Sequence, residues 1–277
     1  MEFIKMHGIG NDYVYINCFK NPVPEDPAAL SVAVAKEHFG VGSDGLILIE
    51  PCEGADARMR IFNKDGSEGE MCGNGVRCVG KYLYDSGIAK KEYISVDTLG
   101  GLKILKMKIE NGVAVGARVD MGVPSAVPSV IPIKGEENPL YVEEGGAKLK
   151  FFCVNCGNPH AVTHDLFPDE ETLFRLGPLF EKSSTFPERA NISFCRVVDE
   201  NHLVARIWER GSGPTLACGT GATATFMASY LQGLCGKGAY VKLPGGELYI
   251  EYDEESGHVY MTGPAEITFT GNWTNKL

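Results

Sequence analysis

Short apolar or alternating segments recur along this chain of 277 residues, and Gly, Pro, Asn and Asp residues separate them. Segments of this length, bounded by turn-forming residues, are typical of β-strands. The strands predicted on this basis are residues 13–17, 45–50, 59–63, 94–98, 203–209 and 246–252.

Helical periodicity is clearest after two Cys-Gly-x-Gly segments, which begin at Cys72 and Cys218. Apolar or small residues then recur at the i, i+3, i+4, i+7 spacing that places them on one helix face. We therefore predict a helix after each cysteine, and two further helices at residues 27–40 and 169–181. The predicted buried faces comprise positions 76, 79, 80 and 83 in the first helix and 222, 225, 226 and 229 in the second.

The chain contains an internal repeat. Residues 60–84 align with residues 206–230 without a gap, at an offset of 146, so that Cys72 falls on Cys218. Two copies in register, with flanking strands and Gly-Gly turns, indicate a duplicated strand–loop–helix unit. The weaker similarity outside this segment pairs further polar residues, namely Asn11 with Asn158 and Asp44 with Asn191.

The repeat predicts an α+β fold of two pseudo-symmetric domains, each with mainly antiparallel sheet around a central helix. We place the first domain at residues 1–118 and the second at residues 119–263, and the Pro- and Gly-rich segment 120–150 makes the crossing. Equivalent motifs of a duplicated protein can face each other across a pseudo-twofold axis. We therefore expect the active site in the cleft between the two domains.

Charge, hydrophobicity and cysteine content argue against some kinds of binding partner and location. The formal net charge is −10, which argues against a nucleic acid or an anionic membrane surface, because both attract clustered Lys and Arg. No apolar run approaches the roughly 20 residues of a membrane helix, and the first residues do not resemble a signal peptide. The nine cysteines are an odd number in a chain without an export signal, so we expect reduced thiols and a cytoplasmic location.

A cysteine at the start of a helix has a chemical use. Unpaired N–H groups and the helix dipole favour a thiolate there, and the glycines let the backbone approach a ligand. One such cysteine is more often a small buried residue than a catalytic group. Two in symmetric copies predict an acid/base pair, in which one thiolate removes a proton from a carbon and a thiol returns one on the opposite face.

Several segments carry a family resemblance. "MHGIGNDYV", "IFNKDGSEGEMCGNGVRC", "GNPHAV", "FPERANISF", "ERGSGPTLACGTGA" and "LPGGEL" resemble the signature segments of the diaminopimelate epimerases over nearly the whole chain. The resemblance implies interconversion of LL-2,6-diaminopimelate and meso-diaminopimelate, for lysine and peptidoglycan synthesis, with no pyridoxal phosphate, other cofactor or metal. It also implies that a last strand at about 264–275 joins the first domain. The sequence leaves the oligomeric state open, a homodimer included.

The resemblance also assigns site residues. The matching catalytic positions are Cys72, Cys218, His160 and Glu209, and His160 matches a histidine beside the reacting carbon. In chemical terms, Arg210 can clamp a carboxylate and Glu209 can meet an ammonium group. The positions that match substrate-binding residues are Asn11, Asn63, Gly73, Asn74, Asn158, Asn191, Glu209, Arg210, Gly219 and Thr220.

Some positions depart from the family pattern or allow a structural interpretation. Gly45 stands where some members carry a glutamine, and Thr220 stands where some carry a serine. The asparagines lie beside Gly, Pro or Lys-Asp-Gly and could be turn residues, as could Asp44. Glu209 and Arg210 could form a surface ion pair, and His160 could be a structural histidine.

Other function classes remain as alternatives. Cys153 and Cys156, followed by His160 and His164, have a spacing that superficially suits zinc or a redox motif. That reading leaves the paired Cys72 and Cys218 motifs unexplained. A binding protein that inherited the fold, a proline or hydroxyproline racemase, and a phenazine-type isomerase are the remaining alternatives.

Overall fold

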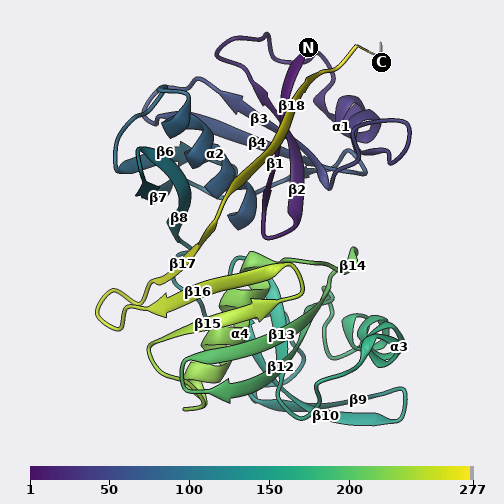
Figure 1. Ribbon diagram of the computed structural model, residues 1–277. Coiled ribbons are helices and arrows are strands. Elements are labelled where there is room, and N and C mark those ends of the chain that lie inside the picture. The colour runs from purple at the N-terminus through teal and green to yellow at the C-terminus, as the bar shows by residue number, and fades with distance from the viewer. Residues whose placement is uncertain (275–277) are drawn as a thin grey trace. The chain divides into compact units, whose positions relative to one another are not determined.

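The structure is a computed structural model that describes residues 1–274, and it divides the chain into two compact units. Unit 1 comprises Met1–Asp120 together with the residues from Thr262 onward, and unit 2 comprises Met121–Met261 (Figure 1). The chain therefore passes from unit 1 to unit 2 and back again. Each unit is described below by itself.

Unit 1 combines antiparallel and parallel strand pairs. Strand β1 pairs with both β2 and β18, so the end of the chain lies beside its beginning. The pairs β2–β3 and β4–β6 are parallel. The elements of unit 1 are β1 (Glu2–Gly8), β2 (Asn11–Asn17), α1 (Pro27–Ala35), β3 (Gly45–Glu50), β4 (Ala57–Asn63), β5 (Glu68–Gly69), α2 (Gly73–Asp85), β6 (Tyr93–Asp97), β7 (Lys103–Glu110), β8 (Val113–Asp120) and β18 (Glu266–Asn272).

Unit 2 repeats this order of elements. Strand β10 pairs with β9 and β11, and the pairs β11–β12 and β13–β15 are parallel. Strand β17 runs across the boundary between the units. The elements from β9 onward are β9 (Leu140–Glu144), β10 (Ala147–Asn155), β11 (Pro159–Thr163), α3 (Glu170–Glu181), β12 (Asn191–Asp199), β13 (His202–Glu209), β14 (Gly213–Pro214), α4 (Gly219–Leu231), β15 (Gly238–Leu243), β16 (Gly246–Tyr252) and β17 (Val259–Pro264).

The parallel pairs occur where a helix connects two strands. In unit 1, α1 lies between β2 and β3, and α2 lies between β4 and β6; α3 and α4 hold the same places in unit 2. A crossover helix returns the chain to the same edge, which makes the flanking strands parallel. Strand pairs without an intervening helix, such as β3–β4 and β12–β13, are antiparallel, as predicted, and the fold is of the α+β class.

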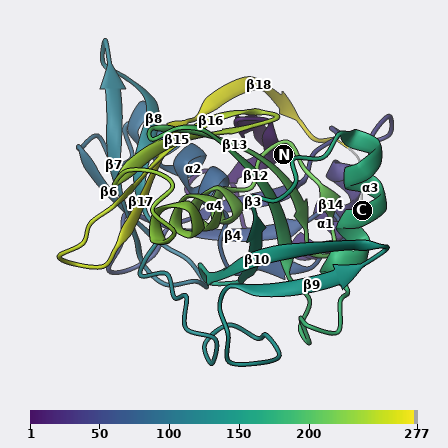
Figure 2. The same cartoon turned by 90° about the horizontal axis from the view of Figure 1, so that it is seen from below.

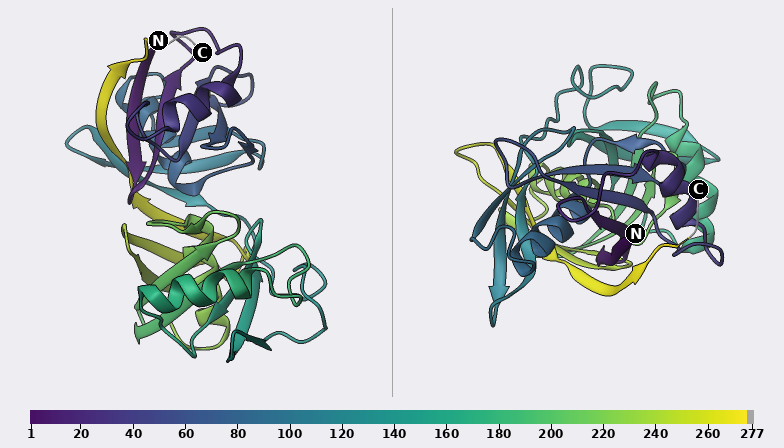
Figure 3. Two further views of the ribbon diagram at one scale, coloured as in Figure 1. Left: turned by 90° about the vertical axis from the view of Figure 1, so that its right-hand side faces the viewer. Right: turned by 90° about the horizontal axis from the view of Figure 1, so that it is seen from above.

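The outer helices cover one face of the strands in their own unit. Helix α1 packs on β3 and β4, and α3 packs on β12 and β13 (Figure 3). In each unit the interface between outer helix and strands forms an apolar core. In unit 1 this core consists of Phe3, Val14, Ile16, Leu30, Val34, Leu46, Leu48 and Phe62. In unit 2 it includes Phe151, Leu173, Leu176, Phe180, Ile192 and Phe194.

The central helices begin directly after the two cysteines, as predicted. Every position of the predicted faces is buried, including Gly80, where an added Cβ would lie 2.9 Å from Leu105 Cδ2. Helix α4 contacts β10, β11, β12, β13, β15 and β16, and Figure 2 shows it surrounded by strands of its own unit. This enclosure explains why the helical periodicity of α4 is weak, since a helix covered on all sides has no polar face.

The strand registers correct one predicted pairing of the repeat. Leu46 lies opposite Phe62, and Ile192 lies opposite Trp208, so the offset of 146 persists through these strands. Asn191 is therefore equivalent to Gly45, and its predicted pairing with Asp44 is wrong by one residue. Because neighbouring strand positions face opposite ways, this single step changes which side chain has a counterpart.

Two segment predictions were also wrong. Helix α1 ends at Ala35 rather than at residue 40, because Lys36 is extended, with φ −60° and ψ 119°. The segment 120–150 is more than a crossing, since it contains β9 and the start of β10. These two strands form a hairpin around Gly145 and Gly146, which both have positive φ, and such values suit glycine.

Candidate active site

Cys72 and Cys218 are the N-caps of α2 and α4. Both residues are extended, with φ/ψ of −131°/116° and −123°/110°. Each sulfur accepts a hydrogen bond from the backbone N–H three residues later, at 3.3 Å from Gly75 N and from Gly221 N respectively. A sulfur thus takes the place that a Ser or Asp oxygen usually occupies at a helix start.

The glycines are required by space. A Cβ at Gly75 would lie 2.7 Å from Ile47 Cδ1 and 3.6 Å from the Cys72 sulfur. A Cβ at Gly221 would lie 2.5 Å from Ile207 Cδ1 and 3.1 Å from the Cys218 sulfur. The second glycine of each motif therefore keeps the sulfur and a neighbouring isoleucine in place.

Polar side chains surround Cys72 in unit 1. Asn11, at the start of β2, places its Oδ1 3.2 Å from the Cys72 sulfur and 3.3 Å from Asn74 Nδ2. Asn63, at the end of β4, instead donates to Ser67 Oγ at 3.0 Å, within the turn that follows. The structure thus brings Asn11 and Asn74 to the sulfur, whereas the side chain of Asn63 stabilises its own turn.

Two charged residues near Cys72 were not predicted as site residues. Asp44 accepts hydrogen bonds from Asn11 Nδ2 at 2.7 Å and from Asp12 N at 3.1 Å. Arg77 has an exposed fraction of 0% and donates to Asn74 Oδ1 at 2.8 Å. A turn was the natural reading of Asp44 beside Gly45. Arg77 lies one turn after the cysteine, and only its position in a buried helix reveals it.

The backbone conformation explains why residue 45 is a glycine. Its φ is +152°, and a Cβ built there would lie 2.0 Å from Phe62 O. The backbone of β3 and β4 therefore excludes a glutamine at this position. The departure from the family pattern is built into the strand pairing.

The surroundings of Cys218 favour its neutral form. The side chain is 7% exposed, and burial together with the nearby Glu209 carboxylate raises the pKa of the thiol well above its ordinary value. The bonds from Gly221 N and Thr220 lower the pKa less than burial raises it. The expectation that the helix start yields a thiolate is thus wrong for Cys218 in this structure, because desolvation outweighs the helix N–H groups.

Glu209 ends β13 and accepts a hydrogen bond from the hydroxyl of Thr215, across the short hairpin that leads to α4. The hairpin is held by a second carboxylate, Glu181, which is 4% exposed. Glu181 accepts from Trp208 Nε1 at 2.8 Å and from Gly211 N at 3.1 Å. These bonds place Glu209 beside Cys218, and neither partner was predicted from the sequence.

His160 is fully buried in β11. Its Nε2 lies 2.7 Å from Asn158 Oδ1, so that nitrogen carries the proton if the Asn158 oxygen accepts. Burial, and secondarily the charge of Arg210, lowers the pKa of His160 to about 3. The imidazole is therefore neutral across the physiological range.

The side chain of Asn191 is hydrogen-bonded to the backbone of Arg210. Asn191 donates to Pro159 O at 2.9 Å, and its Oδ1 accepts from Arg210 N at 2.9 Å. The Arg210 side chain donates to Glu188 O at 3.0 Å, which uses one of its five N–H groups. Asn191 thus fixes the main chain at Arg210.

The zinc-like spacing does not produce a zinc-like cluster. Burial raises the pKa of both Cys153 and Cys156 to about 12, which opposes the thiolate form that zinc requires. His164 Nε2 lies 2.9 Å from Ser229 Oγ. Within residues 1–274, no group of three or more His, Cys, Asp or Glu side chains could hold a metal ion.

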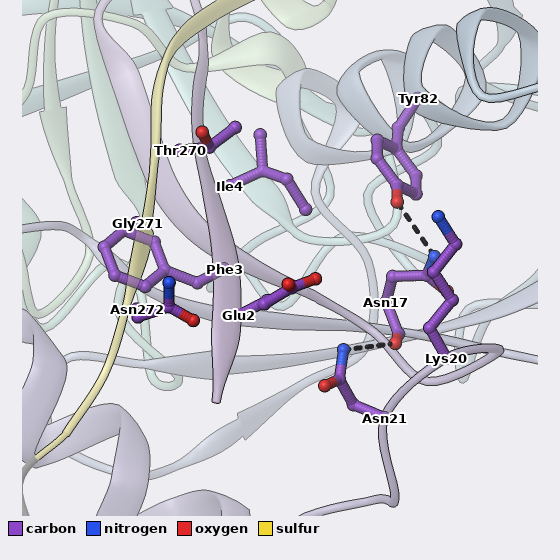
Figure 4. A pocket seen from close by; sticks show the side chains of 10 residues that line it. All are labelled: Glu2, Phe3, Ile4, Asn17, Lys20, Asn21, Tyr82, Thr270, Gly271 and Asn272. Atoms are coloured by element: carbon purple, nitrogen blue, oxygen red, sulfur yellow. Dashed lines mark hydrogen bonds between the residues drawn. The ribbon is translucent and has the colours of Figure 1, made fainter.

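A surface pocket in unit 1 lies away from the cysteine. It has a volume of about 400 Å³ and is lined by Phe3, Asn17, Tyr82, Asn272 and neighbouring residues (Figure 4). Tyr82 is near the C-terminal end of α2, whereas Cys72 caps the N-terminal end. None of the predicted site residues lines this pocket.

The predicted site residues fall into two groups. Those in unit 1 are Asn11, Asn63, Cys72, Gly73 and Asn74. Those in unit 2 are Asn158, His160, Asn191, Glu209, Arg210, Cys218, Gly219 and Thr220. At the start of α2, Cys72 has Asn11, Gly73 and Asn74 beside it, whereas Asn63 serves a turn. At the start of α4, Cys218 has Glu209, Gly219 and Thr220 beside it. The other four residues of unit 2 are linked to one another by hydrogen bonds or by charge: Asn158, His160, Asn191 and Arg210.

The sequence pattern of one known family spans both cysteine motifs. The diaminopimelate epimerase pattern matches residues 3–127 and 152–268. This chain belongs to the diaminopimelate epimerase family. It is accordingly an enzyme of the isomerase class. Among its described residues, no helix is both long and apolar enough to span a membrane.

Relatives in sequence cover the whole chain. A diaminopimelate epimerase of Methanococcus maripaludis strain C5 is 49% identical over 274 residues, which is 98% of this chain and 99% of the relative. A diaminopimelate epimerase of Acetivibrio thermocellus is 49% identical over 278 residues, with 98% of each chain covered. The similarity that supports membership in the family thus extends over nearly the whole chain.

Solved structures share the fold at low identity. A probable proline racemase from Agrobacterium radiobacter K84 has a TM-score of 0.76 at 15% identity, covering 99% of this chain and 93% of its own. A hydroxyproline epimerase from Agrobacterium vitis has a TM-score of 0.71 at 14% identity, covering 98% and 91%. At these identities the similarity establishes the two-domain α+β fold and says nothing of substrate.

Proposed function

We propose that this enzyme interconverts LL-2,6-diaminopimelate and meso-diaminopimelate without an added cofactor, in the synthesis of lysine and peptidoglycan precursors. The observation that carries the proposal is the matched capping of α2 and α4 by Cys72 and Cys218. Family membership and the names of relatives about half identical to the chain support the same substrate.

The two cysteines act as a base and an acid on opposite faces of one carbon. One sulfur, as a thiolate, removes the α-proton, and the other, as a thiol, supplies a proton to the opposite face. Burial and Glu209 favour the neutral form of Cys218, which is the form that can donate a proton. In the reverse reaction the roles exchange.

The N–H groups at the helix starts support the intermediate. Removing an α-proton leaves negative charge on the carbon and its carboxylate, and oriented donors stabilise such charge as it develops. The backbone N–H groups of Gly73 and Asn74 in α2, and of Gly219 and Thr220 in α4, lie in the first turns of their helices. We assign the binding of the α-carboxylate to these turns.

The remaining polar residues suit a doubly zwitterionic substrate. Arg210 keeps donors beyond its bond to Glu188 O and can bind a carboxylate bidentately. Glu209 can accept from an ammonium group, and neutral His160 adds no charge to the site. Asn63 and Asn191 would contact substrate only with side-chain atoms that their present bonds leave unused.

The finer predictions on setting and partners also belong to this proposal. We expect the enzyme to work in the cytoplasm on this small molecule, without nucleic acid or a membrane. The net charge of −10 supports that expectation. The proposed chemistry uses only residues of a single chain and does not depend on whether the chain forms a homodimer.

A direct assay tests the proposal. The purified protein, with no cofactor added, is incubated separately with LL-diaminopimelate, L-proline and trans-4-hydroxy-L-proline, and the stereoisomers are resolved by chiral chromatography. We expect meso-diaminopimelate from the first and no inversion of the other two. Inversion of proline alone would overturn the substrate and retain the two-cysteine chemistry. Tight binding of diaminopimelate without turnover would overturn the enzymatic function.

A further inference from the structure

Four polar side chains form a continuous hydrogen-bonded chain beside Cys72. Arg77 Nη2 donates to Asn74 Oδ1 at 2.8 Å, and Asn74 Nδ2 donates to Asn11 Oδ1 at 3.3 Å. Asn11 Nδ2 then donates to Asp44 Oδ2 at 2.7 Å. Two amides thus lie in series between a cation and a carboxylate.

The charged ends determine how both amides face. A guanidinium can only donate hydrogen bonds and a carboxylate can only accept them, whereas an amide can do either. Arg77 therefore requires the oxygen of Asn74, and Asp44 requires the nitrogen of Asn11. The inner bond, from the Asn74 nitrogen to the Asn11 oxygen, is satisfied only in this orientation.

Both ends are held by the fold. Arg77 is fully buried and also donates to Gly73 O at 3.1 Å and to Pro264 O at 3.2 Å. The backbone of β1 closes over it, since a Cβ at Gly8 would lie 2.8 Å from Arg77 Nη2. Asp44 accepts from the Asp12 backbone N–H at 3.1 Å. These anchors do not depend on the asparagines.

The orientation matters for Cys72. The Asn11 oxygen lies 3.2 Å from the sulfur, where it accepts the S–H proton. A reversed amide would present N–H to the same sulfur and would favour the thiolate instead. The side on which the Asn11 oxygen lies therefore biases whether Cys72 carries its proton.

The second half of the protein lacks this chain. At the offset of 146, Thr220 takes the place of Asn74 and Thr223 takes the place of Arg77. Thr223 donates to Gly219 O at 2.9 Å, within its own helix. The chain is thus specific to Cys72, although the two cysteines cap their helices alike.

We propose that Asp44 and Arg77 are positioning residues, which hold the amides of Asn11 and Asn74 so that the Asn11 oxygen accepts the proton of Cys72. The catalytic meaning of this inference rests on the proposed function. The orientation itself does not, because it can be measured without substrate.

Other titratable groups also surround this site. Lys5 from β1 pairs with Asp12, and buried Tyr15 from β2 and Cys78 from α2 lie close enough to interact electrostatically with Cys72. Burial raises the pKa of Tyr15 above its ordinary value and that of Cys78 to about 11, so both stay neutral at neutral pH. They are unchanged in the variants below, and the comparison isolates Asp44 and Asn11.

The experiment follows alkylation of Cys72 by iodoacetamide against pH, with the labelled peptide quantified by mass spectrometry. In Asp44→Ala the Asn11 amide can turn, so we expect the midpoint for Cys72 to fall by about one pH unit, as one modest hydrogen bond implies. Asp44→Asn keeps an acceptor for Asp12 N and Asn11, and should retain the wild-type midpoint. Thr223→Val, the matched change in α4, should also leave the Cys72 midpoint unchanged.

A double-variant cycle shows whether Asp44 acts through Asn11. Asn11→Ala removes the acceptor from a partly exposed position, and should lower the midpoint as Asp44→Ala does. The double variant should shift no further than Asn11→Ala alone. Additive shifts, or an unchanged midpoint in a folded Asp44→Ala, would overturn the proposal. The same holds if Asp44→Asn shifts as far as Asp44→Ala, since charge would then be the operative factor.

Arg77 is tested in the same assay. Arg77→Lys keeps a donor-only cation and should stay near the wild-type midpoint, whereas Arg77→Met should move it in the same direction as Asp44→Ala. Equal midpoints for the two variants would remove Arg77 from the proposal. Because alkylation needs no turnover, a failed epimerase assay leaves this test intact, and a failed alkylation test leaves the epimerase assignment intact.

Discussion

Cys72 and Cys218 stand in the same relation to their helices, since each sulfur lies 3.3 Å from the backbone nitrogen of the glycine three residues further along. Their chemical surroundings nevertheless differ. Cys72 faces the amide oxygen of Asn11, whereas Cys218 lies near the Glu209 carboxylate. A duplicated backbone thus presents two thiols whose proton affinities can be set separately.

Replacing either capping cysteine by alanine should abolish epimerisation. The loss of an acid or base typically costs on the order of a hundred- to ten-thousand-fold. Cys153→Ala and Cys156→Ala serve as controls and should retain most activity, because neither residue caps a helix and burial raises the pKa of both thiols to about 12. The measurement is kcat with LL-diaminopimelate, alongside thermal unfolding of each variant. A loss at Cys156 equal to that at Cys72, in a folded protein, would mean that the wrong thiols were chosen.

The origin of the incoming proton separates one base from two. In D2O, starting from LL-diaminopimelate and stopping early, the meso product should carry solvent deuterium at the inverted carbon. Unreacted substrate should remain mostly protiated, because the proton removed stays on the first sulfur. Mass spectrometry of the separated isomers measures both. Early product that is mainly protiated would indicate a single base and exclude the two-cysteine mechanism.

The second glycine of each motif offers a paired test of packing. Gly75→Ala and Gly221→Ala should each destabilise the protein by about 1–3 kcal/mol, as overpacking does. Ile47→Val and Ile207→Val each delete the Cδ1 atom that the new methyl group would meet, so each should restore most of the stability lost to the alanine beside it. Urea unfolding of the four single and two double variants measures this.

The recovery of activity in the double variants should differ between positions 75 and 221. The new Cβ at residue 75 would lie 3.6 Å from the sulfur, an ordinary contact, so Gly75→Ala with Ile47→Val should recover activity. At residue 221 the distance is 3.1 Å, so the sulfur of Cys218 must move, and activity should stay low even when stability returns. Equal recovery at both sites would show that the position of the sulfur tolerates this change.

Buried His160 should make stability depend on pH. Its pKa is lowered to about 3 in the folded protein, against about 6.5 in an unfolded chain, so the unfolded state binds the extra proton between these values. Neutral His160 therefore makes its full contribution to the free energy of unfolding above about pH 6.5. That contribution is lost as the pH falls toward 3. Between pH 7 and pH 4.5 the wild type should lose on the order of 2 kcal/mol more than His160→Gln. The exposed His38, replaced by Asn, provides a control that should follow the wild type.

The internal repeat accounts for how much could be predicted. A fixed offset identified both capping cysteines and both central helices, because glycine spacing and helical periodicity are local signals. Asp44 was misplaced against Asn191, since a register step of one residue leaves no local signature. The hydrogen-bonded chain from Asp44 to Arg77 includes a step between Asn11 and Asn74, which are 63 positions apart, and such contacts depend on how the elements pack.

Burial explains the other differences. The helix start alone predicts a reactive thiolate, yet Cys218 is buried beside Glu209, and desolvation by burial dominates its pKa. Strand β9 was missed because Leu140–Glu144 follows a stretch rich in Pro and Gly, and its pairing with β10 comes only from the hairpin. Local sequence patterns do not report either environment.

The pairing of β1 with β18 has a consequence for how the protein is made. Residues 2–7 pair with residues 266–272, whereas all the strands of the β9–β16 hairpins and crossovers lie within a continuous stretch of chain. During synthesis, unit 2 can assemble its own sheet as soon as it leaves the ribosome. Unit 1 must keep one edge of β1 open until the final residues emerge. The half of the protein that is translated first is therefore the last to be completed.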